Sequence, residues 1–399
     1  MKRIDFENGN IVSNILKAAL PMLVAQIMSL LYNIVDRVYI ARIPDVGTTA
    51  LGAVGLCFPI IVIITAFSNL FGTGGAPIFS IERGKGNHAK AGLLMNTSFT
   101  LLALCAVILM IAGLLFARPI LVLFGASDAG LAYAYPYLMI YLLGTFPSMA
   151  ATGMNPFINA QGYATTGMTS VIIGAVANLL LDPLFIFVFG LGIKGAAIAT
   201  VISQTLSAAF VLYFLHYKAE YRIRFLSKTE LTSCGEDAKN IVSLGTAGFI
   251  MQLTNSLVTI CANNVLSVTG GDVYISVMTI ISSVRQMVET PIYAITEGSS
   301  PIISYNYGAG NAKRIRQTFK CMLAVSMTAL TVFWLFVQLS PTTFIRIFSN
   351  SEEIIATAGW TLRVYMAVFC MFSIQMSVQQ TFTALGKAKA SLFIACLRK

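Results

Sequence analysis

The feature that most constrains this chain is a series of ten apolar segments, each long enough to cross a lipid bilayer as a helix. They lie near residues 13–40, 50–80, 93–117, 131–152, 167–189, 195–216, 240–267, 273–303, 318–340 and 357–384, and an eleventh begins at Ala390. Hydrophobic residues make up 57% of the sequence and charged residues 11%, whereas about 25% of a soluble domain is charged. The sequence therefore predicts an all-α polytopic membrane protein.

The distribution of Lys and Arg predicts the orientation of these segments. With the N-terminus placed inside, the inner loops hold about three times as many Lys and Arg residues as the outer loops, and positive charge favours the cytoplasmic side. We therefore expect a cytoplasmic N-terminus in the plasma membrane of a prokaryote. The net charge of +10 then belongs to the loops and does not indicate a nucleic-acid partner.

An internal repeat organises the chain. The segment Gly74–Asn87 recurs 224 residues later as Gly298–Asn311, with Gly, Pro, Ile, Ser, Gly, Gly and Asn at matching positions. An even number of spans separates the two copies, which predicts two parallel repeats related by an axis along the membrane normal. We expect an N-terminal six-helix lobe over 1–216, a cytoplasmic linker over 217–238 and an incomplete C-terminal lobe over 239–399.

The repeat also predicts that the second lobe is shorter than the first. Residue 399 corresponds to residue 175 of the first half, so roughly 49 residues of the second repeat have no counterpart in this sequence. We expect a C-terminally truncated form of a twelve-span protein of roughly 448 residues. A native design with ten spans is the alternative.

One carboxylate stands out within the apolar segments. Asp182 is the only ionisable residue between Met168 and Phe189, and a charge in hydrocarbon costs about 2.5 kcal/mol or more unless it faces a partner or a cavity. Asn178 lies four residues earlier on the same helix face, and Pro183 lacks a backbone donor. This arrangement indicates a site for a proton or a bare cation; a carboxylate hydrogen-bonded near the interface is the alternative.

Several motifs, taken in order, resemble those of the multidrug and toxic compound extrusion (MATE) transporters. The matching stretches are Pro21–Asp36, Gly84–Asn87, Gln161–Gly162 leading into Asn178–Pro183, Gly195–Thr200 and Ser304–Asn311. The resemblance implies two helical lobes, alternating access, and export of organic cations in exchange for Na⁺ or H⁺, with no catalytic residues and no cofactor beyond the coupling ion. A single chain is expected to act as a monomer.

The resemblance also implies a cation site in the N-terminal lobe. Its residues are Asp36, Asn178, Asp182 and Thr200, with the first three as ligands if the ion is Na⁺. Two carboxylates, an amide oxygen and a hydroxyl are hard oxygen ligands, and paired carboxylates can also share a proton. A local pair between Asp36 and Arg37 is the alternative for that carboxylate. Neutralisation of the pair is expected to let the lobe repack by bending at Pro21, where a backbone donor is missing.

The C-terminal lobe departs from the family pattern. Its seventh segment carries Gln252 where some relatives have an acidic residue, and its tenth has no carboxylate. Arg285 and Glu289 stand four residues apart and are expected to pair on one helix face. Aromatic, amide and acidic side chains of both lobes are candidates for binding a lipophilic cation: Tyr32, Asn33, Gln204, Gln252, Asn255, Glu289, Tyr293, Glu297 and Gln375.

Two other classes of function are less consistent with the sequence. A flippase for a lipid-linked saccharide needs a basic cavity for pyrophosphate, but only Arg285 lies deep in a span, beside Glu289 and Glu297. An intramembrane enzyme is disfavoured because no HExxH, GxSxG or GxGD motif occurs. A scaffold role is a third alternative.

Overall fold

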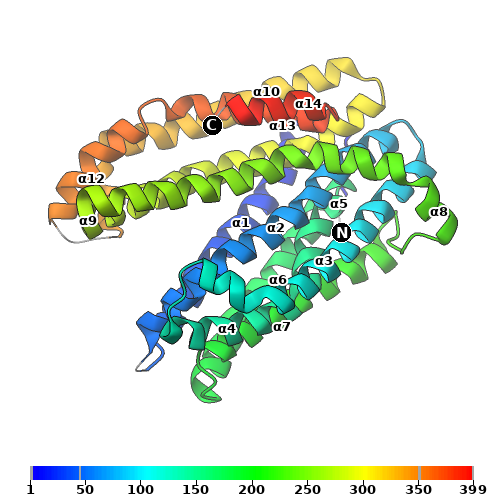
Figure 1. Cartoon of the computed structure of the whole chain (residues 1–399). Helices are drawn as coiled ribbons and strands as arrows, with labels where there is room; N and C mark the ends of the chain where they lie inside the picture. The colour runs from blue at the N-terminus through cyan, green and yellow to red at the C-terminus, as the bar shows by residue number, and fades with distance from the viewer. Residues whose placement is uncertain (1–2, 45, 349–351, 398–399) are drawn as a thin grey trace.

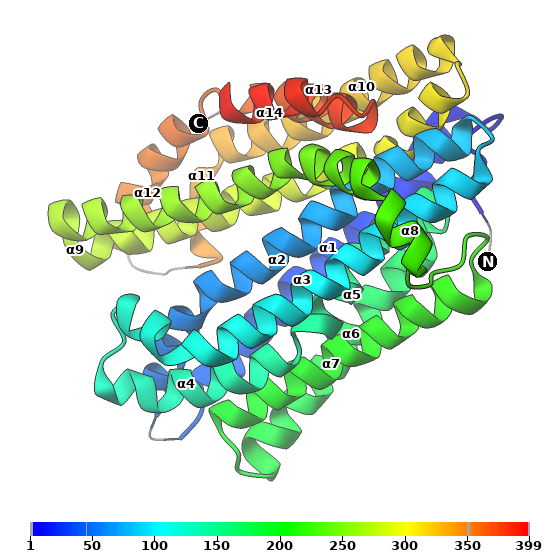
Figure 2. The same ribbon diagram turned by 45° about the vertical axis from the view of Figure 1, so that its right-hand side comes forward.

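The protein is a two-lobed helical bundle in the computed structural model, which describes residues 3–44, 46–348 and 352–397. The first lobe holds α1 (Ile11–Ala41), α2 (Gly47–Gly84), α3 (His88–Leu123), α4 (Asp128–Leu143), α5 (Thr145–Ala160), α6 (Ala164–Pro183), the π-helix η1 (Leu184–Val188), α7 (Ile193–Tyr213) and the π-helix η2 (Phe214–Lys218). Figure 1 shows the lobes meeting at one end and diverging toward the other, and Figure 2 shows the same V from a second direction.

The second lobe begins after the short linker helix α8 (Lys228–Ser233). It contains α9 (Gly235–Gly308), α10 (Ala312–Leu339), α11 (Pro341–Arg346), α12 (Glu352–Tyr365), the 3₁₀-helix η3 (Phe369–Met371), α13 (Phe372–Ala384) and α14 (Ala388–Leu397). Buried apolar side chains form separate cores in the two lobes. A third cluster joins the lobes and contains Phe6 and Ile15 from the start of the chain with Ile302 and Met322 from α9 and α10.

The element α9 is a hairpin of two antiparallel arms. It comprises 74 residues, which would extend about 110 Å in a straight helix. Yet Gly74 of α2 lies against Ile241 at its start, and Gly84, only ten residues further along α2, lies against Tyr305 at its end. Figure 1 shows the same element running away from the first lobe in green and returning in yellow. The two arms correspond to the predicted segments 240–267 and 273–303.

The number of bilayer-length helices differs from the ten expected. Among the described residues, seven helices are long and apolar enough to cross a membrane, or eight if the pair around residue 367, bent by 47°, counts as one span. The segment predicted over 131–152 is divided at Gly144 into two 16-residue helices, because Pro147 lacks the backbone donor that would continue the helix. The second arm of α9 is less apolar, since it carries Arg285, Glu289 and Glu297.

Exposed apolar side chains support the membrane assignment. Along α1 they recur every three or four residues, which places them on one face: Val12, Leu16, Leu20, Val24, Ile27, Leu31, Ile34 and Val38. Such a continuous apolar stripe is unfavourable in water but favourable against lipid. The protein is therefore a multi-pass membrane protein.

The lobes touch through two glycines at matching positions of the repeat. A Cβ atom built on Gly84 would lie 2.0 Å from the carbonyl oxygen of Tyr305, and one built on Gly308 would lie 1.9 Å from that of Ile81. Residues 81 and 305, like 84 and 308, are 224 positions apart, so the contact is reciprocal, as an approximate two-fold relation requires. The absence of a side chain at both glycines lets the helices approach to backbone contact.

The linker between the lobes is fastened to the first lobe. The backbone amides of Tyr221 and Arg224 donate to the side-chain oxygens of Gln161 and Asn96. Arg224 also donates two hydrogen bonds, of 2.7 and 2.6 Å, to Glu230, and these hold the pKa of Glu230 down at about 2. The basic loop expected over 217–238 is thus an ordered connection containing α8.

Candidate functional site

Two carboxylates from different helices meet inside the first lobe. Asp36 lies near the end of α1 and Asp182 near the end of α6, and their carboxyl groups lie within hydrogen-bonding reach of each other. Asp182 is fully buried, and Asn178 donates from Nδ2 to its Oδ1 at 3.1 Å. The structure therefore brings together three of the four residues expected at the cation site.

Three buried oxygens at this pair lack donors. Asp36 Oδ1, Asp182 Oδ2 and Asn178 Oδ1 are buried and have no hydrogen-bond partner in the described structure. An ionised carboxylate only accepts hydrogen bonds, so two of them in contact need a proton or a cation between them. The chemistry of this cluster fits either a shared proton or an ion that prefers oxygen ligands.

The local backbone gives the site its shape. Pro183 ends the regular turns of α6 directly after Asp182, and the chain continues as the π-helix η1. A proline removes a helical donor and crowds the preceding turn, and wider π turns are common beside functional side chains. Thr200 of α7 lines the same cavity as Asp36 and Asn178, but its hydroxyl donates to the carbonyl of Ala196 at 2.9 Å. The Thr200 oxygen retains the capacity to accept a hydrogen bond or to bind a cation.

A cavity of about 660 Å³ opens beside the carboxylate pair, between the lobes. Its walls come mainly from α1, α2, α5, α6 and α7 of the first lobe, and α9 and α13 close it from the second. Eight of the predicted residues line it: Tyr32, Asn33, Asp36, Asn178, Thr200, Gln204, Gln252 and Glu297. This volume is in the range of small-molecule binding sites.

The carboxylate of Glu297 faces the cavity from the second lobe. Gln26 of α1 donates to it, with Nε2 lying 3.4 Å from Glu297 Oε2. Gln26 stands ten residues before Asp36, which separates the two acidic positions by about 15 Å along the α1 axis. The cavity therefore has one acidic group on each side.

The remaining predicted residues lie outside the cavity lining. Glu289 is buried and pairs with Arg285 at 3.5 Å, as expected from their spacing. Tyr293 packs its ring against Phe372, with centroids 5.9 Å apart, and Gln375 donates to Gln379 at 2.7 Å. Asn255 is half-buried on the first arm of α9. The contacts of Glu289, Tyr293 and Gln375 join parts of the second lobe to one another.

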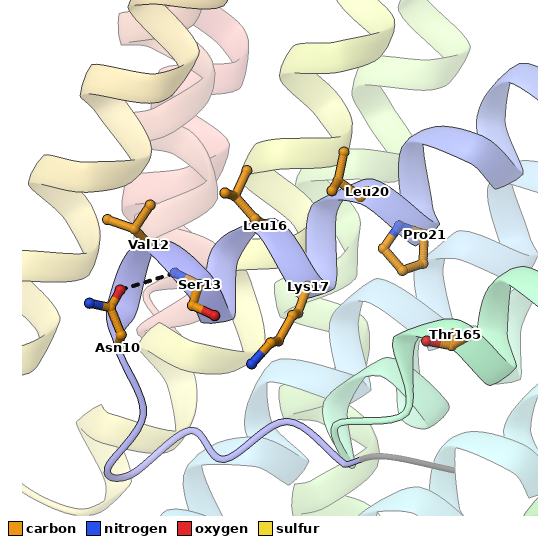
Figure 3. Close-up of a pocket in the computed structure, with 8 residues that line it drawn as sticks. All are labelled: Asn10, Val12, Ser13, Leu16, Lys17, Leu20, Pro21 and Thr165. Carbon is orange, nitrogen blue, oxygen red and sulfur yellow. Dashed lines mark hydrogen bonds between the residues drawn. The ribbon is translucent and has the colours of Figure 1, made fainter.

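Pro21 lies on the outer side of α1. Figure 3 shows it beside Leu20 and Lys17 in a separate shallow groove of about 710 Å³, facing Thr165 of α6. The helix continues through Pro21, where the proline leaves the carbonyl of Lys17 without its helical donor. The predicted hinge is thus near, but not in, the central cavity.

Several polar residues of the cavity were missed by the sequence analysis. Asn69 donates at 3.1 Å across the lobes to Gln252, which was predicted. Tyr141 accepts at 3.4 Å from Gln204, which was also predicted, and Asn155 and Asn159 line the α5 wall. A signal was present for Gln26, which shares one face of α1 with Asn33 and Asp36 because of its helical spacing. Asn69 likewise is a polar residue within an apolar segment.

Comparison with known proteins agrees with this architecture. The MatE family model matches residues 21–184 and 247–398, which together cover most of the chain. The chain belongs to the MATE family. It is 24% identical over 393 residues to the multidrug export protein MepA of Staphylococcus haemolyticus, and the match covers 98% of this chain and 85% of that relative.

Solved MATE structures share the fold. A crystal structure of MATE in the straight conformation superposes with a TM-score of 0.91 at 22% sequence identity, covering all of this chain and 88% of the other. The outward-facing conformation of a multidrug resistance MATE family transporter of the MOP superfamily gives 0.89 at the same identity and coverage. The all-helical two-lobed fold expected from the sequence is therefore confirmed, and the family is one of transporters rather than enzymes.

Proposed function

We propose that this protein is a secondary antiporter that exports organic cations in exchange for Na⁺ or H⁺, by alternating access, in a bacterial plasma membrane. The observation that carries the proposal is the contact between Asp36 and Asp182, each of which has one buried oxygen without a donor. Asp36 also lines the wall of the cavity between the lobes. The related MepA is a multidrug export protein. A monomer with a cytoplasmic N-terminus is part of the proposal.

The ion site would couple to the cavity through charge. A proton shared by Asp36 and Asp182, or a Na⁺ ion held by them with Asn178 Oδ1 and the Thr200 hydroxyl, removes negative charge from the cavity wall. The affinity for a cationic substrate then falls, and linkage requires substrate to weaken ion binding by the same factor. We place the resulting change of conformation at α1, with bending at Pro21.

The carboxylate that lines the cavity from the second lobe would provide the counter-charge for substrate. Glu297 faces the cavity with only an amide donor at 3.4 Å, and an uncompensated charge at low dielectric is unfavourable. The wall also holds Tyr32, Tyr137 and Tyr141, whose ring faces attract cations. These acidic and aromatic groups suit a lipophilic cation and disfavour the pyrophosphate of a lipid-linked saccharide.

Transport in a reconstituted system tests this function. The purified protein is placed in lipid vesicles, and accumulation of ethidium is followed by fluorescence with an imposed Na⁺ gradient, an imposed pH gradient, or neither. We expect one gradient to drive uphill movement of the dye. Dye movement that is independent of both gradients would contradict antiport. Transport of a lipid-linked saccharide without transport of the dye would favour the flippase.

Glu297→Gln is expected to weaken ethidium binding about ten-fold, since it removes the counter-charge but keeps the shape and the contact with Gln26. Fluorescence titration of the detergent-solubilised protein measures this change. Glu236→Gln is the matched control because it removes the same charge from an exposed position at the start of α9. Equal affinities of the two variants would remove Glu297 from the substrate site.

A further inference from the structure

The segment before α1 lies between the two lobes at the end where they meet. Ile4 and Phe6 are 8% and 3% exposed, respectively, although they precede the first helix. Both belong to the apolar cluster that also contains Ala164 of the first lobe and Ile302 and Met322 of the second. A chain terminus is usually poorly ordered unless it is tied down, so these contacts need an explanation.

One side of this segment is fastened to the first lobe. The Ile4 amide donates to the carbonyl of Gly162 at 3.0 Å, and Arg3 forms a 2.8 Å ion pair with Glu220 of the linker. Gly162 has a φ of +92°, and a Cβ atom there would lie 2.9 Å from the Ile4 carbonyl oxygen. The loop between α5 and α6 is therefore shaped to receive residues 3 and 4.

The other side is fastened to the second lobe. Arg314 of α10 donates from Nε to the Phe6 carbonyl at 2.9 Å and from a terminal nitrogen to the Gly9 carbonyl at 2.6 Å. Asn306 of α9 adds a third bond, to the Phe6 carbonyl at 2.9 Å. Hydrogen bonds from a charged donor are stronger than neutral ones, so Arg314 is the main attachment on this side.

Aromatic and cationic groups close around Phe6. Its ring lies 6.1 Å from that of Tyr305 in α9. The guanidinium of Arg83, from α2, lies 5.7 Å from the Phe6 ring and 5.3 Å from the Tyr305 ring and also donates to the Ala160 carbonyl at 2.7 Å. Phe6 thus sits between a residue of each lobe, directly beside the reciprocal contact of Gly84 and Gly308.

We propose that residues 3–9 are a strap that holds the lobes together at this end and must detach from Arg314 and Asn306 before the cavity opens there. The inference deepens the proposed alternating access and rests on it. The strap joins elements that would have to separate, through a few polar contacts whose partners water can replace once the end opens. Residues 3–9 would therefore set the balance between the two states.

Distance measurements on the whole protein in lipid nanodiscs test the strap. Spin labels carried by unnatural amino acids at Lys218 and Lys313, both exposed, report the separation of the lobes at this end and leave the seven native cysteines in place. We expect Arg314→Ala to raise the ratio of long to short distances about ten-fold, because a hydrogen bond to a charged group contributes at least that factor.

Further variants separate the strap from general damage. Arg316→Ala removes an equal charge from an exposed position two residues away and should leave the distances unchanged. Arg314→Lys and Asn306→Ala are milder changes, and they keep the test valid if Arg314→Ala does not fold. Each should raise the ratio of long to short distances by less than Arg314→Ala does. Unchanged distances in these two variants would overturn the proposal. Because the measurement uses neither substrate nor gradient, a failure of cation export would leave its result interpretable.

Discussion

Asp182→Asn is expected to abolish gradient-driven export, by about 100-fold or more, while leaving the protein folded. Asparagine has nearly the same shape, and its amide can donate to the unpartnered oxygen of Asp36. The variant therefore fixes the pair with one negative charge, as a shared proton would, so that it neither binds nor releases the coupling ion. Uptake of ethidium into vesicles under the effective gradient, normalised to the amount of inserted protein, measures the loss.

Asp128→Asn is the matched control for this experiment. Asp128 lies exposed in the first turn of α4, away from the cavity, so removing its charge should leave transport within two-fold. A second measurement is of binding: Asp182→Asn should bind ethidium with the low affinity of the ion-loaded protein, and this affinity should be independent of Na⁺ concentration and of pH. Export by Asp182→Asn at the control's rate would show that the coupling ion binds elsewhere.

Gly84→Ala is expected to separate the lobes and to lower the melting temperature by several degrees. The added carbon would lie 2.0 Å from the Tyr305 carbonyl oxygen and 2.9 Å from its carbon. Backbone atoms inside a packed helix pair cannot move aside independently, and overpacking of this kind costs about 1–3 kcal/mol. The interlobe distance, together with thermal unfolding followed in detergent, detects both effects.

The repeat supplies an internal check and a control for this second prediction. Gly308→Ala should reproduce the effect, because its added carbon meets Ile81 in the same way. Gly55→Ala, in the same helix as Gly84, meets nothing within 4 Å and should be neutral or slightly stabilising, since alanine favours helices over glycine. A Gly84→Ala protein that behaves like Gly55→Ala would mean that the lobes do not need this close approach.

The sequence predicted a structural feature correctly where a residue in its local setting had a single physical explanation. An acid in an apolar run predicted that Asp182 needs a partner, and Asn178 was identified as that partner from its spacing. The pairing of Arg285 with Glu289 followed in the same way. Repeated glycines at a fixed offset predicted two related halves before any contact was known, and the reciprocal contact of Gly84 and Gly308 agrees with that interpretation.

Other features depended on contacts between distant segments. No local pattern distinguishes Glu297, which faces the cavity, from Glu289 eight residues earlier, which pairs within its own lobe. The division of the segment 131–152 at Gly144 depends on whether the helix continues past Pro147 or ends before it. The hydrophobicity of the segment does not distinguish these two outcomes. The strap could not be predicted because residues 3–9 form only a short segment before the first apolar span. Their contacts with Asn306 and Arg314 join positions some 300 residues apart in the sequence.

The unequal origin of the cavity wall has a consequence for how such a protein adapts to new compounds. In our assignment, the carboxylate pair that binds the coupling ion belongs to the first lobe. Gln252, Glu297 and Gln380 line the cavity from the second lobe. Substitutions on the cavity wall formed by the second lobe would alter which molecules bind, without changing the carboxylates that bind the coupling ion. Selection by a new toxic compound should therefore accumulate changes in α9 and α13 and leave α1 and α6 intact around Asp36 and Asp182.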